Sequence, residues 1–334
     1  MRRDYRPKIA RSMTSRLDIH YHFTPPEFIR QVRARANFDA ARFSPADAAA
    51  RTTSVMLDEL ERHQIDAAIA SPPPPGAWFG NVVIARRLSR MWNEYAARIV
   101  HDHPSQFGFF ALVTPPDRDG SLRELEYALD TLKADGVALV SNYDGQWLGD
   151  PKFDGFMGEL DHRNAVVFVH PTALQASGLP LIANADLNPQ MLEYPFDTTR
   201  TIVSILLAGI PKRYPNIRFI FAHGGGTIPY LAGRLSEIGL DGNPPRNDLY
   251  ASLRTLYFDT ARVANKISLT ALVAVAGKNR IVFGSDAPFF SPSDEIKLMS
   301  TMKVAGQSLL ETAHKNAVTL FSRFSPRDLS SAKR

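Results

Sequence analysis

The chain has 334 residues, of which 44% are hydrophobic and 22% are charged, with a formal net charge of +5. This length can bury the core of one α/β barrel or of two smaller domains. Cysteine is absent, which excludes disulfides, thiolate catalysis and cysteine-bound zinc, so any metal must bind to His, Asp or Glu.

No apolar run approaches the 18 residues that suggest a membrane-spanning helix. No secretory hydrophobic segment is present either, so we expect a cytoplasmic protein with no membrane partner. Much of the positive charge lies in the tails. The sequence shows no basic face with the aromatic or helical elements that contact bases, so we expect no nucleic-acid partner. We expect residues 1–16 to form a flexible basic tail, residues 17–323 a single domain, and residues 324–334 a C-terminal tail.

The first predicted strand covers residues 17–23 and alternates in polarity. A period of two places Asp18, His20 and His22 on one face, with Leu17, Ile19 and Tyr21 on the other. Two imidazoles two residues apart on one strand face can reach a single ion. The alternative is a pair of ordinary surface histidines. The spacing and context favour metal binding.

Thr24 and two prolines then end the strand and open a helix, and Ser44 is expected to cap a helix that runs to His63. The second strand is followed by a loop of four prolines that presents Trp78. A single aromatic residue on a loop is either a packing residue or a substrate contact. Apolar runs predict seven further strands, over residues 65–70, 106–112, 136–141, 165–170, 217–222, 256–259 and 280–286. Helical patterns follow at residues 81–103, 120–134, 151–163, 195–213, 228–238 and 261–276, and a long helical region runs to Phe321.

Eight strands, each followed by a helix, predict a parallel sheet buried on both faces. This count suits a closed (β/α)8 TIM barrel better than an open doubly wound sheet. The first strand also lacks the glycine-rich fingerprint of dinucleotide-binding folds.

Polar residues stand at the ends of several of these strands. They are His20 and His22 of the first strand, His170 of the fifth, His223 of the sixth and Asp286 of the eighth. In barrel enzymes this end of the strands carries the active site. Three histidines and an aspartate that converge there suit one divalent ion, with a position left for water or substrate.

These motifs resemble those of the amidohydrolase superfamily. The resemblance runs from Leu17 to Phe321 and rests on four segments, His20-Tyr-His22, Val169-His-Pro171, Ala222-His-Gly-Gly-Gly226 and Gly284-Ser-Asp286. The branch that looks most similar is that of the non-oxidative decarboxylases related to aminocarboxymuconate-semialdehyde decarboxylase, with proteins of the 6-methylsalicylate decarboxylase type nearest. Glu193-Tyr-Pro-Phe-Asp-Thr-Thr199 is among the segments that carry this finer likeness.

The resemblance implies that His20, His22, His170 and Asp286 hold a divalent metal, zinc or in some members manganese. It makes His223 the acid/base residue beside the metal-bound water. Relatives with two metals carry a Lys or Glu at the end of the fourth strand. This chain has Val140, Ser141 and Asn142 there, so we expect one metal per chain.

Such a site suits the decarboxylation of a small aromatic or unsaturated carboxylate that chelates the ion. Loss of CO2 needs a proton at the carbon that carries the carboxylate, and Asp286 is the candidate acid. His223 would assist Asp286, or would activate water if hydroxide attacks first. Two alternatives stay open, a metal-dependent hydrolase or hydratase (of the lactonase or oxalomesaconate hydratase type) and a non-catalytic barrel with a structural metal.

Substrate contacts are predicted at Trp78, Tyr194 and Arg234, the last two from the resemblance. Arg234 matches an arginine that reaches across a dimer interface, although it is equally compatible with a surface position on a helix. Residues 37–53 depart from the best-known relatives, so a second arginine that binds the substrate is not located, and Arg42 and Arg51 are both candidates. Apolar residues 228–231 directly after the glycine run indicate a homodimer whose interface lies beside the site.

Overall fold

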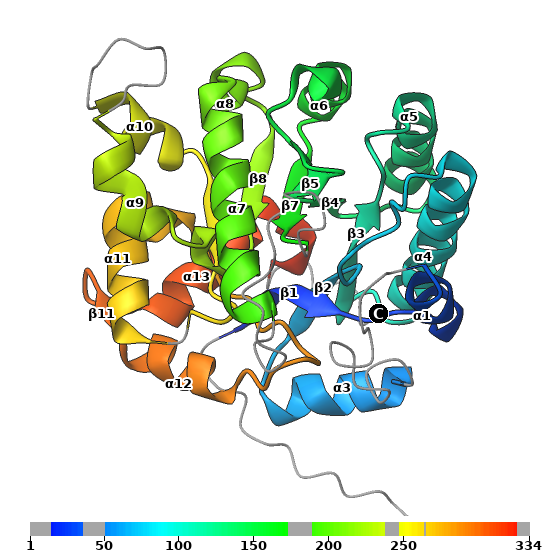
Figure 1. The fold of residues 1–334 in the computed structure, drawn as a ribbon. Helices are drawn as coiled ribbons and strands as arrows, with labels where there is room; N and C mark the ends of the chain where they lie inside the picture. The colour runs from blue at the N-terminus through cyan, green and yellow to red at the C-terminus, as the bar shows by residue number, and fades with distance from the viewer. Residues whose placement is uncertain (1–14, 36–50, 173–188, 238–246, 264, 326–334) are drawn as a thin grey trace, which may run out of the picture.

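The computed structural model describes residues 15–35, 51–172, 189–237, 247–263 and 265–325. In this part of the chain eight parallel strands form one sheet, with helices around it (Figure 1). In their order around the sheet the strands are β1 (Leu17–His22), β2 (Ala67–Ser71), β3 (Phe107–Leu112), β4 (Gly136–Val140), β7 (Val166–His170), β8 (Arg218–Phe221), β9 (Tyr257–Asp259) and β10 (Ile281–Val282).

The sheet closes on itself between its first and last strands. The Ile19 amide donates to the Phe283 carbonyl (3.0 Å), and the His22 amide donates to the Ala287 carbonyl (2.8 Å). These bonds continue β10 beyond its assigned end and pair it with β1. The predicted (β/α)8 barrel is therefore confirmed. Seven strands lie within two residues of the expected ranges, whereas β10 ends at Val282, four residues before the expected end at Asp286.

The described helices are α1 (Pro26–Arg33), α3 (Thr53–Arg62), α4 (Val82–Asp102), α5 (Arg118–Glu126), α6 (Asp154–His162), α7 (Pro189–Leu207), α8 (Ile210–Arg213), α9 (Ile228–Leu235), α10 (Asn247–Leu253), α11 (Lys266–Ala276), α12 (Ser293–Thr301) and α13 (Leu309–Leu320). None of the helices in these ranges has the length and apolar character needed to cross a membrane. The expected helix start at Ser44 lies outside the described residues. Within them, α3 begins after Thr52, whose side chain accepts a hydrogen bond from the Val55 amide.

Several helix boundaries differ from the sequence-based expectation, three of them in ways that have a clear cause. Helix α7 is already present at Pro189 and continues through Pro195, because a proline removes only one bond of the helix ladder and need not end the helix. Helix α11 begins at Lys266 and not at Ala261, because Asn265 caps it through the Ser268 amide (2.8 Å). The long final helical region is interrupted between α12 and α13 by a hairpin of β11 (Lys303–Val304) and β12 (Gln307–Ser308). Its two turn residues, Ala305 and Gly306, both have positive φ, as tight hairpin turns require.

The predicted alternation of β1 also fails in part. In the pairing of β1 with β2, two residues of β1 (Ile19 and His20) oppose one of β2, which is a bulge. As a result Leu17 and Ile19 pack in the interior of the barrel, whereas Tyr21 packs outward with Phe107. The bulge turns His20 and His22 toward the same interior space.

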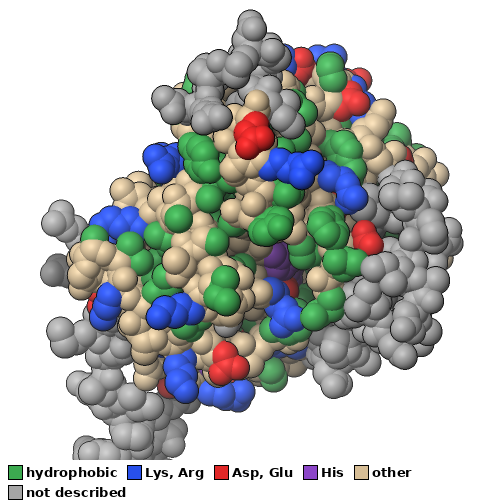
Figure 2. All heavy atoms as spheres, turned by 60° about the vertical axis from the view of Figure 1, so that its left-hand side comes forward, with side chains coloured by type: hydrophobic (Ala, Val, Ile, Leu, Met, Phe, Trp, Pro, Cys, Tyr) green, Lys and Arg blue, Asp and Glu red, His purple; other side chains and the backbone are tan. Residues whose placement is uncertain are grey.

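The interior core takes side chains from all eight strands and is completed by residues of α13 and the turn after it, among them Phe321 and Phe324. The carboxyl ends of the strands are left open to a hollow. Figure 2 shows a histidine side chain recessed there among mainly hydrophobic side chains.

Candidate metal centre and active site

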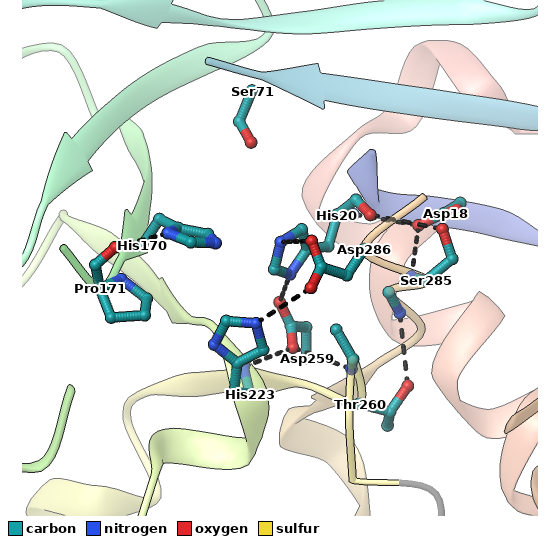
Figure 3. A network of polar contacts seen from close by, with 12 residues as sticks. Asp18, His20, Ser71, His170, Pro171, His223, Asp259, Thr260, Ser285 and Asp286 are labelled. Carbon is teal, nitrogen blue, oxygen red and sulfur yellow. Dashed lines mark hydrogen bonds and ion pairs between the residues drawn. The ribbon is translucent and has the colours of Figure 1, made fainter. Parts of the chain in front are cut away.

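Four buried side chains converge at the carboxyl ends of the strands. His20 and His22 come from β1, His170 ends β7, and Asp286 follows β10. Figure 3 shows His20, His170 and Asp286 around one space. One ligand atom from each of the four lies within 4.8 Å of those of the others. The sequence placed these residues on three strands that are far apart in the chain, and the barrel brings them together.

Each of the three histidines has its Nδ1 engaged by an acceptor. His20 Nδ1 pairs with Asp259 Oδ2 (2.6 Å), His22 Nδ1 with the Ser71 carbonyl (3.0 Å), and His170 Nδ1 with the Pro171 carbonyl (2.7 Å). In the neutral imidazole this places the proton on Nδ1 and leaves a lone pair on Nε2.

The Nε2 atoms of His20 and His22 are only 3.1 Å apart, and each lies within 3.4 Å of Asp286 Oδ1. Two lone pairs at this distance repel each other, so either a proton on His20 or a bound cation must lie between them. Three imidazole nitrogens and one carboxylate oxygen are also the donor set that zinc and similar divalent ions take. The residues present therefore fit a divalent metal.

Charge interactions within the site act on its pKa values. Burial alone would lower the pKa of His20, but the negative charges of Asp259 and Asp286 outweigh it and raise this pKa to about 10. Burial would raise the pKa of Asp286, and the attraction of His20 outweighs it, so this pKa lies well below its usual value. Burial lowers the pKa of His170 far below its usual value. Asp286 is therefore ionised, and without a metal the positive charge belongs to His20.

Asp259, at the end of β9, is a site residue that the sequence analysis did not select. Besides binding His20, its other oxygen accepts the His223 amide (2.8 Å) and the Ala261 amide (3.1 Å). It thus orients the His20 ring and fixes the start of the glycine loop. The same signal, a strand that ends in a polar residue, was available at this position.

Asp18 and Gly284 fix the positions of His20 and of the segment that carries Asp286. Asp18 Oδ1 accepts the His20 amide (3.1 Å) and the Ser285 amide (3.0 Å), which ties β1 to the segment that carries Asp286. Burial raises the pKa of Asp18 to about 7. Gly284 has no room for a side chain, because a Cβ there would lie 2.6 Å from His20 Cβ.

His223 lies at the edge of the four ligands. Its Nε2 is 3.5 Å from Asp286 Oδ2, and its ring centroid is 5.1 Å from that of His20. Its Nδ1 is buried, and among the described residues it has no hydrogen-bond partner. Both His223 (φ 56°) and Asp286 (φ 59°) adopt the left-handed backbone region, a strained conformation that occurs preferentially at functional sites.

His170, His223 and Asp286 line a cavity of about 720 Å³. Its wall is mainly apolar and includes Phe289 and Phe290 after β10. Cavities of this size and character bind small organic ligands.

The residues predicted to contact the substrate occupy different places. Tyr194 lines the cavity, and its ring centroid lies 5.8 Å from that of His170. Trp78 is not among the lining residues, and its indole donates to Asp144 Oδ2 (2.7 Å). Arg234 is exposed on α9, outside the cavity wall.

The two further candidate arginines give no cavity contact. Arg42 lies outside the described residues. Arg51 forms an ion pair with Glu59 and lies over the ring of Tyr21 (5.7 Å), on the outer side of β1. In their place, Arg33 and Arg262 are the arginines that line the cavity within the described part of the chain.

A closed parallel barrel with a three-histidine, one-aspartate cluster at its carboxyl end is the architecture of metal-dependent hydrolases and lyases. The amidohydrolase family profile matches residues 17–318. The chain belongs to this family, as its motifs predicted.

Its relatives narrow the class further. It is 35% identical to 6-methylsalicylic acid decarboxylase of Penicillium expansum over 294 residues, covering 84% of this chain and 87% of that protein. It is 32% identical to decarboxylase yanB of Aspergillus niger, covering 95% of this chain and 90% of the relative. Among solved structures, manganese-bound 5-carboxyvanillate decarboxylase of Novosphingobium aromaticivorans superposes with a TM-score of 0.81 at 20% identity, covering 93% and 96% of the two chains. The expected class, a carbon–carbon lyase that releases CO2, is confirmed, and the hydrolase or hydratase alternative is not favoured.

Proposed function

We propose that the protein is a metal-dependent, non-oxidative decarboxylase of hydroxybenzoates of the 6-methylsalicylate type. One observation carries the proposal: two of the four convergent residues, His170 and Asp286, line a mainly apolar cavity together with His223. An aromatic ring with a small alkyl group suits such a wall, and a carboxylate with an adjacent hydroxyl suits the metal centre.

We further propose one divalent ion per chain, zinc in the first place and manganese as the alternative, held by His20, His22, His170 and Asp286. When bound, the ion neutralises the charge of the substrate's carboxylate and hydroxyl oxygens. Within the described residues the end of β4 supplies no ligand of the kind that holds a second ion, because Ser141 and Asn142 both donate to Asp197. One ion is therefore the better fit.

The reaction needs a proton at the ring carbon that carries the carboxylate. In our proposal His223 supplies this proton and Asp286, 3.5 Å away, delivers it to the carbon. The C–C bond then breaks, its electron pair returns to the ring, and CO2 leaves. The net change replaces the carboxylate by hydrogen, so 6-methylsalicylate gives 3-methylphenol.

We also propose a homodimer with the interface beside the cavity mouth. Tyr230 is 89% exposed on α9, and Ile267 and Met191 are exposed nearby on the cavity rim. A rim of large apolar side chains suits a second protein surface, and a two-fold partner is the commonest one.

The test is to incubate the purified protein with 6-methylsalicylate and to measure CO2 and 3-methylphenol. His223→Asn should keep its metal and lose about 10²–10⁴-fold in turnover, whereas His170→Ala should lose the metal itself. His101→Asn, a change at an exposed histidine, serves as the matched control. Hydrolysis of lactones without CO2 release from any hydroxybenzoate would overturn the proposal.

A further inference from the structure

A short turn after β9 presents a charged side chain to the cavity. The Val263 amide donates to the Thr260 carbonyl (2.9 Å), and Thr260 Oγ1 accepts the Gly284 amide (3.3 Å). At its start the Ala261 amide is bound to Asp259, the same residue that orients His20. The turn is thus fixed directly to the metal centre.

Arg262 stands in the middle of this turn. Its neighbours Ala261 and Val263 are buried, whereas Arg262 is exposed and lines the cavity. Its backbone has φ 63°, in the left-handed region that side chains rarely adopt. The fold therefore keeps the backbone of Arg262 in a strained conformation and places its long cationic side chain at the cavity wall. Such strain points to a role in function.

The guanidinium of Arg262 is held by apolar and aromatic groups. Its Cζ lies 3.5 Å from the ring centroid of Phe290, and Nη2 lies 3.9 Å from Met191 Sδ. Among the described residues no carboxylate lies within ion-pair distance of it. The one carboxylate in the described cavity wall is Asp286, which the histidines engage.

A guanidinium binds a carboxylate through two parallel hydrogen bonds, which are stronger than a contact with an aromatic face. We propose that Arg262 is a specificity-determining residue that binds the carboxylate of the aromatic substrate. This inference rests on the proposed function, since it names the group that recognises that function's substrate. It also separates substrate from product, because the phenol formed has no carboxylate left to bind.

The contact exists in the bound substrate and is not strengthened as CO2 becomes neutral. Loss of such a ground-state interaction raises KM more than it lowers kcat. For Arg262→Gln we expect KM for 6-methylsalicylate to rise about 10- to 100-fold. We expect kcat to change less than about threefold and metal content to stay the same. Arg262→Lys keeps the charge but not the paired donors, so its KM should lie between those of the wild type and Arg262→Gln.

Lys266→Gln is the matched control, since it removes an exposed positive charge four residues along the chain, outside the cavity wall. The second readout is the inhibition constant of 3-methylphenol, which should be unchanged in Arg262→Gln. Three outcomes would each overturn the inference: an unchanged KM in Arg262→Gln, an equal rise in Lys266→Gln, or an equal loss of 3-methylphenol binding.

Direct binding of salicylate, measured by calorimetry, keeps the two proposals apart. If the wild-type protein releases no CO2, the proposed function fails. Salicylate binding that is about 10- to 100-fold weaker in Arg262→Gln would still support the role of Arg262. Equal binding by both proteins would refute it.

Discussion

Substitution of Gly226 by alanine should damage both the stability and the activity of the protein. Gly226 has φ 65° and ψ −121° and closes the turn that begins at His223. A Cβ at this position would lie 2.1 Å from the Pro195 carbonyl oxygen and 2.8 Å from Thr199 Oγ1. Neither the backbone oxygen nor the glycine turn can yield without moving α7 or His223.

The magnitude follows from two additive costs. A non-glycine residue in this backbone region costs about 1–3 kcal/mol, and overpacking against fixed atoms costs about 1–3 kcal/mol more. Gly209→Ala is the control for a positive φ without close packing, because Gly209 has φ 64° and ψ 22° and nothing lies within 4 Å of its Cβ position. We therefore expect about 4 kcal/mol for Gly226→Ala and about 1 kcal/mol for Gly209→Ala.

Thermal unfolding followed by circular dichroism compares the two variants. For a chain of 334 residues, a difference of about 3 kcal/mol corresponds to a Tm gap of roughly 4 °C. Displacement of His223 by about 1 Å should also lower kcat/KM about 100-fold in Gly226→Ala. Equal Tm values for the two variants, with full activity in both, would refute the packing argument.

Three further predictions concern the metal centre and the assembly. Asp259→Asn should weaken metal affinity about 10- to 100-fold in a chelator competition, and unchanged affinity would remove Asp259 from the site. In the metal-free protein the pKa of His20 is raised from 6.5 to about 10, so the folded state binds its proton more tightly. The contribution of His20 to stability should therefore be fully present below pH 6.5 and be lost as the pH rises toward 10. Melting curves should show this slope in metal-free wild type and lack it in His20→Asn. Arg234→Ala should raise KM with normal metal content, and mixing it with His223→Ala chains should restore part of the activity. A monomer in light scattering would contradict the dimer.

The strands and the strand-end residues could be predicted because both signals are local. A buried parallel strand is an apolar run, and a polar residue that ends it, such as His170 or His223, is visible in the sequence itself. The barrel then requires that these ends meet at one face, whatever their separation in the chain.

The sequence-based predictions fail where contacts between distant parts of the chain determine the local structure. The bulge in β1 depends on its pairing with β2, and the passage of α7 through Pro195 depends on the packing of the whole helix. The helical pattern over residues 261–276 places Arg262 inside a helix, where nothing marks it as a cavity residue. Asn265, a strong N-cap residue, would have shown that Arg262 precedes the helix.

The tie between Asp18 and Ser285 joins residues 267 positions apart in the chain. Asp286, the neighbour of Ser285, follows the last strand of the barrel and is the fourth residue of the proposed ligand set. On the ribosome, the three histidines therefore emerge well before the carboxylate that completes their coordination. Contacts of such long range form late in folding. The proposed metal centre is thus complete only after nearly the whole barrel has been synthesised, so we expect metal to bind at the end of folding.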